Sequence, residues 1–489
     1  MSAANGVAAG RGTTGPERRG SVDLLVRHGH VLTMDDESRV IRDGAVAIRG
    51  RRIVEVGEDA EVAARHDARR TINAAGAPVH PGFVDTHLHA SFHIFRGAVP
   101  DHVSEAEVFD AIERPYYNAV TDEDEELGVL LASLEMIRNG TTCFLEAGTV
   151  LAPSAAAAAA EAVGIRAVIA DARVMDNPRP ERRIRRSPAN LDEALARLGG
   201  ELRRNADPDA LVTGHVAVLG FGTATDDLLR EAKRLADAGG AVLNMHHAYG
   251  VGDTANDRAR FGVDPLVHFA EVGILARNLT LGHANHLTDR ECDLLIETGA
   301  SIAWAPAASM LWGHGGTIHG RHAELWHRGA AIALGSDSGN WSNDFDLFRQ
   351  ANLAVLTARE AHEDRTALIA EDVLEMATRG GARAAGLEDR IGSIEPGKRA
   401  DIVIHTLDRP GLMPVTDMAR NLVYASGSRS IRTVIVDGAV VLDDGAFARL
   451  DEARLLAQVN AASQALFGRM GVTMSPNRFP GRRGPAGRP

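Results

Sequence analysis

The middle of the chain alternates between short apolar runs and longer segments in which apolar residues recur at helical spacing. Short apolar runs bounded by turn residues are typical of buried parallel strands, and the longer segments are typical of amphipathic helices. We expect eight strands, in "GFVDTHLH", "TTCFLEAG", "IRAVIAD", "LVTGHVAVLG", "AVLNMHH", "LTLGHANH", "SIAWAPA" and "AIALGSDS". The clearest helices lie between them, in residues 122–139, "DDLLREAKRLADAGG", "VDPLVHFAEVGI", "TDRECDLLIETG" and "GRHAELWHRG". Repeated strand–helix units over roughly 300 residues predict a (β/α)8 barrel.

The two ends of the chain have a different texture, in which short alternating strands are separated by turns. This pattern is found in "VDLLVRHGHVLTM" and "GAVAIRGRRIVEVG" near the start, and it returns in "GSIEPGKRADIVIHT" and "IRTVIVDGAVVLDDG" near the end. It predicts a small all-β unit. The competing layout for the middle is an open, doubly wound sheet, but no glycine-rich fingerprint follows the first strand.

Composition narrows the class of protein. The chain has 489 residues, of which 45% are hydrophobic and 24% charged, as in globular proteins. The net charge of −13 argues against a nucleic-acid partner, and no run of 18 apolar residues predicts a membrane span. Only Cys143 and Cys292 are available, too few for a disulfide framework, so we expect a reducing, cytoplasmic location. Residues 1–20 contain no apolar core and are expected to be a disordered tail.

Several predicted strands end in residues that bind metals. The first ends in His87 and His89, which point to the same side of a strand because they are two residues apart. The fifth ends in His246 and His247, the sixth in His283 and the eighth in Asp337. Carboxyl ends of strands form the active sites of such barrels, and imidazoles with a carboxylate suit zinc, or another divalent transition metal such as iron.

Lysine is rare, which bears on the chemistry of the site. The sequence has only Lys233, in an amphipathic segment, and Lys398, in a turn. Neither ends a predicted strand. No lysine is therefore placed to form a Schiff base or, after carbamylation, to bridge two metal ions.

Five motifs together resemble the amidohydrolase superfamily, and within it the branch of triazine hydrolases and methylthioadenosine/S-adenosylhomocysteine deaminases. They are "VHPGFVDTHLH", "LEMIRNGTTCF", "LGHANHLTDRE", "ALGSDSGNWSNDFDLF" and "GSIEPGKRADIVI". The resemblance implies a (β/α)8 barrel with a small β-sandwich built from both chain ends. We place the sandwich at 21–80 and 391–448, the barrel at 81–390, and a C-terminal helix and tail at 449–489.

The resemblance also implies roles for the strand-end residues. His87, His89, His246 and Asp337 take the positions of the ligands of a single metal ion, and His283 that of a histidine next to the metal. A bound divalent ion lowers the pKa of a water molecule to about 7. Asp337 is then expected to take the proton of that water and pass it to the leaving group, while His283 orients the water or polarises the substrate.

The sequence differs from this branch at the positions that contact the substrate. The deaminases carry H-x-x-E at the fifth strand, but the glutamate position is Tyr249 if His246 is the ligand, or Gly250 if His247 is. We favour His246 and expect Tyr249 to contact substrate. The Ser-Asn pair after the seventh strand is replaced by Ala308-Ser309, and "VLGFGTATDD" has no counterpart of the Pro-His-Ala that follows the fourth.

Further candidates lie near the expected mouth of the barrel. His93, His102, His314, His319 and His322 either line the mouth or lie on the surface, and Arg96-Gly97 matches a loop anchor of the family. Trp312 and Trp341 follow the seventh and eighth strands, where they form either an apolar wall over a planar substrate or part of the packing.

The sequence thus predicts a metal-dependent hydrolase that cleaves a C–N bond in a small nitrogenous, cyclic compound and forms a homo-oligomer. Because the strand-five glutamate is missing, a dehalogenating or other non-deaminating reaction remains as an alternative. A barrel that has lost hydrolysis is a second alternative.

Overall fold

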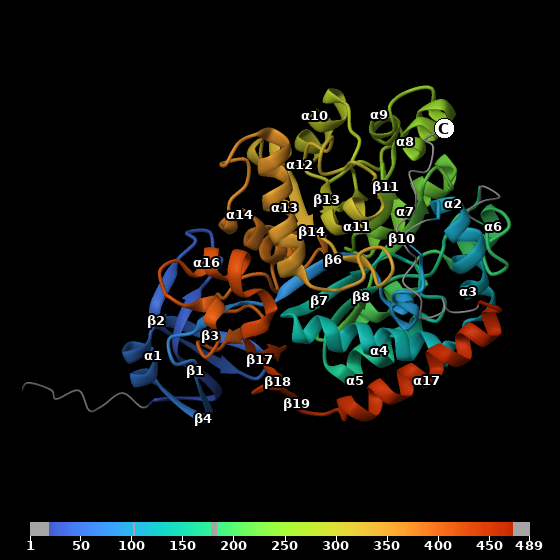
Figure 1. The fold of residues 1–489 in the computed structure, drawn as a ribbon. Coiled ribbons are helices and arrows are strands. Elements are labelled where there is room, and N and C mark those ends of the chain that lie inside the picture. The colour runs from blue at the N-terminus through green and yellow to red at the C-terminus, as the bar shows by residue number, and fades with distance from the viewer. Residues whose placement is uncertain (1–18, 101–102, 178–182, 473–489) are drawn as a thin grey trace, which may run out of the picture.

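We describe residues 19–100, 103–177 and 183–472 of a computed structural model (Figure 1). The predicted tail at 1–20 lies almost entirely outside this part of the chain, as do His102 and the last residues of the predicted C-terminal tail. Within the described residues, no helix combines the length and apolar character needed to cross a membrane.

Strands from both chain ends form one nine-stranded sheet. Its order is β19-β18-β17-β16-β5-β1-β2-β3, with β4 beside β1. The strands are β1 (Gly20–Leu32), β2 (Val40–Arg49), β3 (Arg52–Glu58), β4 (His66–Asn73), β5 (Pro78–Pro81), β16 (Ile402–His405), β17 (Ile431–Val436), β18 (Ala439–Asp443) and β19 (Ala446–Phe447). The early strands and the late ones lie together at one end of the molecule in Figure 1. The prediction that both ends of the chain build one β unit is confirmed, whereas its division into two layers stays a prediction.

Alternation along β1 explains why this sheet is buried on both faces. Leu24 and Val26 belong to one apolar cluster, which also contains Ile402 from the far end of the chain. Leu25 points to the opposite face and packs in a cluster with Val62 of helix α1 (Asp59–Arg65). A strand with side chains of period two can serve two cores in this way.

The middle of the chain forms two five-stranded parallel sheets, β15-β6-β7-β8-β9 and β10-β11-β12-β13-β14. Their strands are β6 (Phe83–His89), β7 (Thr141–Glu146), β8 (Arg166–Ile169), β9 (Val212–Gly214), β10 (Val216–Gly220), β11 (Leu243–His247), β12 (Leu279–His283), β13 (Ser301–Trp304), β14 (Ala331–Leu334) and β15 (Asp337–Ser338). All eight predicted strands are present, and the fourth and eighth are each divided into two pieces.

Both divisions lie where the two sheets meet. At the first, His215 N donates to Ile169 O over 2.9 Å and Val216 N to Val242 O over 3.1 Å, so the fourth strand bonds to both neighbours. At the second, Gly335 N donates to Trp304 O over 2.8 Å. Thr86 Oγ1 of the first strand donates to Leu334 O over 2.8 Å. Backbone and side-chain bonds therefore continue across both junctions.

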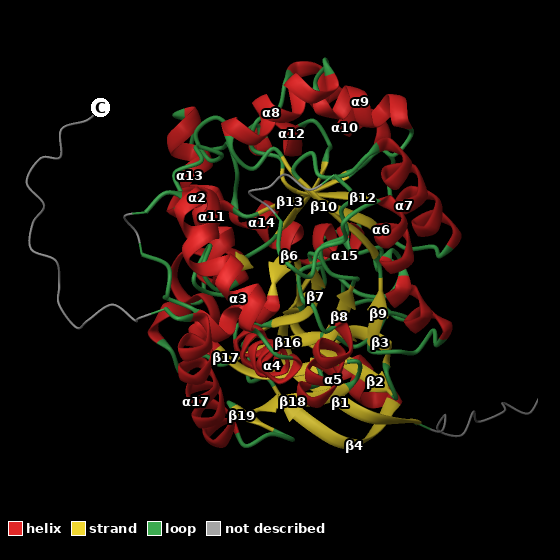
Figure 2. Ribbon diagram, turned by 90° about the vertical axis from the view of Figure 1, so that its right-hand side faces the viewer, coloured by secondary structure: helices red, strands yellow, loops and turns green. Residues whose placement is uncertain are grey.

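Helices lie outside the parallel strands (Figure 2). They are α2 (Glu105–Val108), α3 (Arg114–Ala119), α4 (Asp122–Arg138), α5 (Pro153–Val163), α6 (Leu191–Arg197), α7 (Asp226–Ala238), α8 (Val251–Phe261), α9 (Pro265–Val272), α10 (Asp289–Thr298), α11 (Pro306–Leu311), α12 (His322–His327), α13 (Leu347–His362), α14 (Ala370–Glu375) and α15 (Gly381–Ala384). The acidic segment predicted to start a helix does so, because Thr121 caps α4 in a capping box with Asp124. Two helices belong to the C-terminal part, α16 (Met418–Asn421) and α17 (Glu452–Met470).

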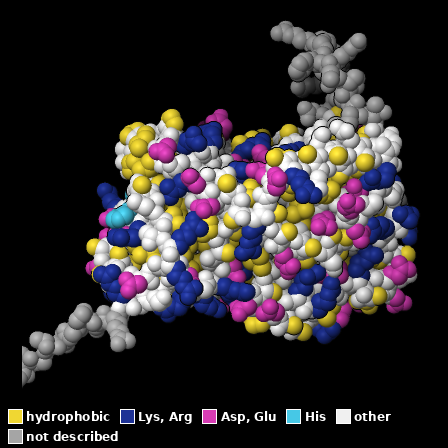
Figure 3. Space-filling view, turned by 90° about the horizontal axis from the view of Figure 1, so that it is seen from below, with side chains coloured by type: hydrophobic (Ala, Val, Ile, Leu, Met, Phe, Trp, Pro, Cys, Tyr) yellow, Lys and Arg dark blue, Asp and Glu magenta, His cyan; other side chains and the backbone are white. Residues whose placement is uncertain are grey.

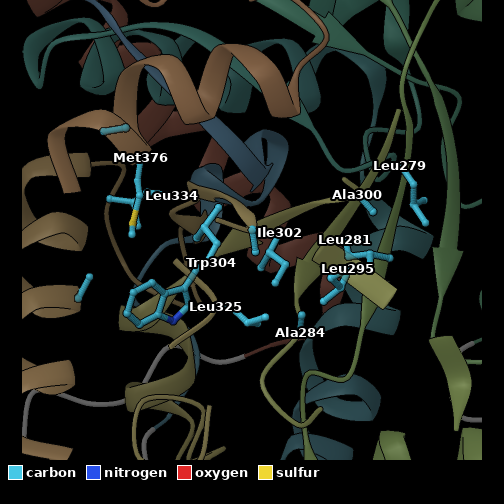
Figure 4. Close-up of a cluster of buried hydrophobic side chains, with 14 of the residues drawn as sticks. Leu279, Leu281, Ala284, Leu295, Ala300, Ile302, Trp304, Leu325, Leu334 and Met376 are labelled. Atoms are coloured by element: carbon cyan, nitrogen blue, oxygen red, sulfur yellow. The ribbon is translucent and has the colours of Figure 1, made fainter. Parts of the chain in front are cut away.

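The layer between strands and helices is the main core. Leu281 of β12 and Ile302 of β13 are fully buried and pack in one cluster with Leu295 of α10 and Leu325 of α12 (Figure 4). Burying such a side chain stabilises the fold by about 1.5–3 kcal/mol. The outer surface is mixed, with acidic and basic side chains interspersed on the face seen in Figure 3.

A buried ion-pair network joins the parallel strands to the terminal sheet. Arg166 of β8 donates to Asp401 over 3.0 Å, and both side chains are 2% exposed. Arg166 also donates to Asp437 over 3.0 Å. Asp401 ends the "EPGKRAD" turn, so the motif identified in the sequence supplies the carboxylate of this joint.

Candidate metal centre and active site

Five buried side chains converge at the carboxyl ends of four strands. His87, His89 and His246 offer nitrogen atoms that lie within 4.8 Å of one another, and His87, His283 and Asp337 form a second group by the same measure. The structure thus brings together every strand-end residue that the sequence singled out for the metal and its neighbourhood.

His87 lies in the centre of this cluster. Its ring centroid lies 4.5 Å from that of His283 and 4.7 Å from that of His246. Within the described residues neither of its ring nitrogens has a hydrogen-bond partner. Burial and the neighbouring imidazoles hold its pKa well below the usual range, so the ring is neutral. An unprotonated nitrogen in this position has a lone pair available for a cation.

Hydrogen bonds fix the tautomer of His89. Thr149 Oγ1 donates its only proton to Glu146 Oε1 over 2.6 Å, so it accepts from His89 Nδ1, which lies 2.9 Å away. The proton of the neutral His89 ring is therefore on Nδ1, and Nε2 is bare. Glu146 is held as an acceptor by the backbone N–H groups of Gly148 and Thr149, at 2.7 and 3.0 Å, although burial raises its pKa to about 7.

His246 is held in the same tautomer by a different partner. Its Nδ1 donates to Leu219 O over 2.8 Å, because a carbonyl can only accept. Phe221 stacks on its ring at a centroid distance of 4.8 Å. The adjacent His247 faces the other way, toward Phe269 of α9 at 5.7 Å. Of the two registers left open by the sequence, the structure places His246 in the cluster.

The Nε2 atoms of His89 and His246 consequently face each other. They lie 3.3 Å apart, and Asp337 Oδ1 lies 3.3 Å from His89 Nε2. In the neutral rings with the proton on Nδ1, each Nε2 carries a lone pair. Lone pairs directed at one another repel unless a cation lies between them. The donor set, neutral imidazole nitrogens with a carboxylate oxygen, is the one that zinc and similar ions take.

His283 and Asp337 are both held in an uncommon backbone conformation. Their φ angles are 71° and 69°, in the left-handed region that residues other than glycine seldom adopt. His283 O accepts from Nε2 of the buried His322 over 2.8 Å. Burial raises the pKa of Asp337 to about 8, and its Oδ2 has no hydrogen-bond partner among the described residues. Backbone strain of this kind concentrates where geometry serves function.

The cluster opens into a small cavity of about 50 Å³. His89, His246, Tyr249, His283 and Asp337 line it on one side, so Tyr249 lies at the site, as predicted. Five aromatic residues contribute to the other walls: Phe92, Phe109, Tyr117, Phe221 and Trp341. Of the two tryptophans considered in the sequence, Trp341 lines the cavity, and Trp312 stacks on it at 5.0 Å.

Three charged residues of the cavity were missed by the sequence analysis. Glu105 and Glu113 come from the helical segment after the first strand, where the sequence shows no strand end and no motif. Arg173 follows the third strand, and its guanidinium lies 4.6 Å over the ring of Tyr117. The strand-end rule that found the histidines could have found Arg173, and also Glu146 at the end of the second strand.

The remaining histidine candidates separate into different environments. His93 and His322 are buried instead of lying on the surface: His93 Nε2 lies 2.7 Å from Glu135, and His322 stacks on Trp304 at 4.4 Å. Arg96 donates to the same Glu135, which fits its expected part as a loop anchor. His314 contacts the ring of Tyr249 at the edge of the site, at 4.0 Å, and His319 is exposed.

Residues 79–441 match the amidohydrolase family along most of the chain. The chain therefore belongs to the amidohydrolase family, and the predicted class of enzyme, a metal-dependent hydrolase that acts on carbon–nitrogen bonds of small cyclic compounds, is confirmed.

Curated relatives cover most of the chain. A 5-methylthioadenosine/S-adenosylhomocysteine deaminase of Syntrophobacter fumaroxidans is 32% identical over 86% of this chain and 93% of its own. A 5'-deoxyadenosine deaminase of Methanosarcina mazei is 30% identical over 92% and 99%. Among solved structures, a zinc-bound adenosine deaminase of Xanthomonas campestris has a TM-score of 0.85 at 28% identity, covering 92% of this chain and 100% of its own. Atrazine chlorohydrolase of Arthrobacter aurescens shares the fold, with a TM-score of 0.81 at 22% identity and coverage of 90% and 100%.

Proposed function

We propose that this protein is a one-metal hydrolase that removes an amine from a small planar heterocycle, with His87, His89, His246 and Asp337 holding the metal ion. The observation that carries the proposal is the convergence of buried ligand atoms, with the Nε2 atoms of His89 and His246 only 3.3 Å apart. Zinc is the first candidate, since an adenosine deaminase of similar structure binds it, and iron is the second.

A divalent ion held by these residues would lower the pKa of a water molecule to about 7 and so supply hydroxide near neutral pH. Asp337 is placed to accept the proton of that water, because its Oδ2 is not engaged elsewhere among the described residues. The proton then passes to the leaving nitrogen. His283 is neutral because burial holds its pKa well below the usual range, so it can donate a hydrogen bond to, or accept one from, the attacking water or a nitrogen bonded to the reacting carbon.

The walls of the cavity support a small, flat substrate. Phe92, Phe221 and Trp341 offer ring faces on which a planar heterocycle can stack. Ligand pockets usually enclose about 300–1,000 Å³, whereas this cavity has about 50 Å³. A nucleoside would need the walls to move, so we expect adenosine, S-adenosylhomocysteine and guanine to be poor substrates compared with single-ring amino compounds.

The assembled cluster argues against the two alternatives. A barrel that had lost hydrolysis would have no reason to keep five convergent ligand-type side chains, two of them with ring orientations held by hydrogen bonds. Halide removal has the support of a shared fold alone. Tyr249 stands where the resemblance places a glutamate in the deaminases, so the site needs a second acid from elsewhere in the chain.

We further propose that the eight parallel strands close into one (β/α)8 barrel over 81–390, flanked by a small β-sandwich of 21–80 and 391–448. Two observations support closure. The consecutive residues His215 and Val216 bond to opposite sheets, and Thr86 of β6 bonds to Leu334 of β14. A homo-oligomeric, cytoplasmic enzyme remains our expectation for its state in the cell.

Metal analysis of two neighbouring variants tests the proposal. Elemental analysis of the purified protein should give about one transition-metal ion per chain, and His246→Ala should lose it. His247→Ala, one residue away but outside the cluster, should keep it. The same preparations are assayed for ammonia release from amino-substituted pyrimidines, triazines and purines. A protein with no metal, or one whose activity survives a chelator, would refute the assignment.

A further inference from the structure

A carboxylate from another part of the chain reaches the cavity next to Tyr249. Glu105, the first residue of α2, lines the same cavity as Tyr249, His283 and Asp337. Its Oε2 lies 3.6 Å from Nε2 of His314, a histidine on the loop that follows β13 and α11. His314 packs against the ring of Tyr249 at 4.0 Å, and Tyr249 packs against His283 at 4.2 Å. These side chains connect the outer edge of the cavity with the histidine cluster.

The loop around His314 is built to hold that side chain in place. His314 N donates to Ser309 O over 2.9 Å, and His314 O accepts from His286 Nε2 over 2.9 Å. On either side, Gly313 and Gly315 adopt φ angles of 69° and 71°, which suit glycine. These backbone hydrogen bonds and the two flanking glycine turns consequently fix the position from which the His314 side chain extends.

Gly250 provides the space for this imidazole. A Cβ atom at position 250 would lie 2.9 Å from His314 Nδ1, closer than side chains pack. Its φ angle of −116° is open to any residue, so conformation alone does not demand glycine there. Gly250 directly follows Tyr249 in the chain, and because it has no side chain the His314 ring can pack against it.

Glu105 is held at a helix start by its neighbours. Ser104 caps α2 in a capping box with Glu107, which fixes the first turn and therefore the base of the Glu105 side chain. Its side chain is 28% exposed and that of His314 16% exposed, so the pair lies at the border between cavity and solvent. A group at such a border can exchange a proton with solvent and with a bound substrate.

Removal of an amine from a ring carbon beside a ring nitrogen needs two proton movements. When the water oxygen bonds to that carbon, the ring nitrogen must gain a proton or carry the negative charge. The leaving nitrogen must also gain one to depart as ammonia. Asp337 serves the second movement. A tyrosine hydroxyl, with an ordinary pKa of about 10, serves the first poorly.

We propose that Glu105 is the second acid of the site, that His314 positions it and shares its proton, and that the substrate is a heterocycle whose amino-bearing carbon adjoins a ring nitrogen. The inference rests on the proposed hydrolysis. The Glu105–His314 pair gives one proton to the ring nitrogen as the C–O bond forms. The C–N bond breaks, and ammonia leaves with the proton carried by Asp337. The second hydrogen of the water returns to the pair, which leaves a ring carbonyl beside a ring N–H.

Three variants test the two roles. Steady-state kinetics use the amino-substituted pyrimidine or triazine that the parent hydrolyses fastest, and bound zinc is measured for each protein. Glu105→Gln should lower kcat by about 10²- to 10⁴-fold, with KM and bound zinc within threefold of the parent. His314→Gln keeps a hydrogen-bond donor but cannot share a proton, so kcat should fall while KM stays. Gly250→Ala removes no functional group, yet it displaces His314 and should lower kcat in the same way.

Matched controls make the outcomes decisive. His319→Gln changes an exposed histidine of the same loop and should leave kcat unchanged. Glu113→Gln removes the other glutamate that lines the cavity, and a loss of kcat there with full activity in Glu105→Gln would overturn the inference. So would a Glu105→Gln protein that keeps kcat within threefold, or one that loses its zinc. If the parent releases no ammonia from any amino heterocycle while holding metal, the proposed function fails and the inference fails with it.

Discussion

The hydroxyl of Thr149 should control how tightly the protein holds its metal ion. Thr149→Val keeps the shape of the side chain but removes the group between His89 Nδ1 and Glu146 Oε1, which lie 2.9 and 2.6 Å from it. His89 is then free to rotate or to change tautomer, and its Nε2 no longer has a fixed lone pair. Loss of such a supporting partner typically weakens metal binding by about 10- to 100-fold, or about 1.4–2.7 kcal/mol.

Competition with a chromophoric chelator measures the zinc affinity of the parent and the variant at pH 8, where Glu146 is a carboxylate. Thr142→Val is the matched control, because Thr142 is a buried threonine on β7 whose hydroxyl has no hydrogen-bond partner among the described residues. Its zinc affinity should equal that of the parent. A Thr149→Val affinity within twofold of the parent would show that the tautomer argument for His89 is wrong.

Three further outcomes are expected. Asp337→Asn keeps an oxygen at the metal but removes the base, so turnover should fall by about 10²- to 10⁴-fold while metal content, measured in parallel, falls less. Asp401→Asn leaves Arg166 buried with only part of its charge paired, at a cost of about 3–5 kcal/mol. Urea unfolding should therefore show a large decrease in the free energy of unfolding. Asp67→Asn is the control, since its ion pair has side chains that are 55% and 69% exposed, and its free energy of unfolding should change little. The metal-free protein should lose stability as pH rises from about 7.5 to 9. Burial raises the pKa of Asp337 to about 8 and that of Cys292 to about 11, so over this range the folded chain holds more protons than the unfolded chain. The buried histidines do not oppose this trend, because burial lowers their pKa values and they are neutral in both states above about pH 7.5. Thermal unfolding at the two pH values checks this, and a stability that increases with pH would contradict it.

The strand-end residues could be predicted because a parallel strand has simple geometry. A run such as "GFVDTHLH" fixes where the strand ends and which side His87 and His89 share. All parallel strands of a barrel end at one face, so the remaining ligand types at strand ends belonged to the same site. The fifth strand shows the limit, since His246 and His247 point to opposite sides and only the packing of Phe221 and Phe269 separates them.

The walls of the cavity could not be predicted in the same way. Glu105 and Glu113 reach the cavity from a helical segment whose path depends on packing that involves residues distant in the sequence. His93 shows the reverse case: a histidine near the expected mouth turns inward because Glu135 of α4 and the ring of Phe345 receive it. Loop positions follow from contacts between elements, and a single sequence does not contain those contacts explicitly.

The environment of His87 has a consequence for how this enzyme can change through evolution. A Cβ atom at Gly282 would lie 2.7 Å from the His87 ring, and one at Gly335 would lie 2.8 Å from its Cβ atom. These two glycines therefore leave the space that the His87 imidazole fills. Replacing His87 by a smaller residue would leave a void in the interior, and filling that void would require side chains at both glycine positions. Glu105 lies at the border with solvent, and none of the described glycines makes room for its side chain. Selection can therefore exchange substrates by altering the walls, while the central histidine is retained by the cost of an empty interior.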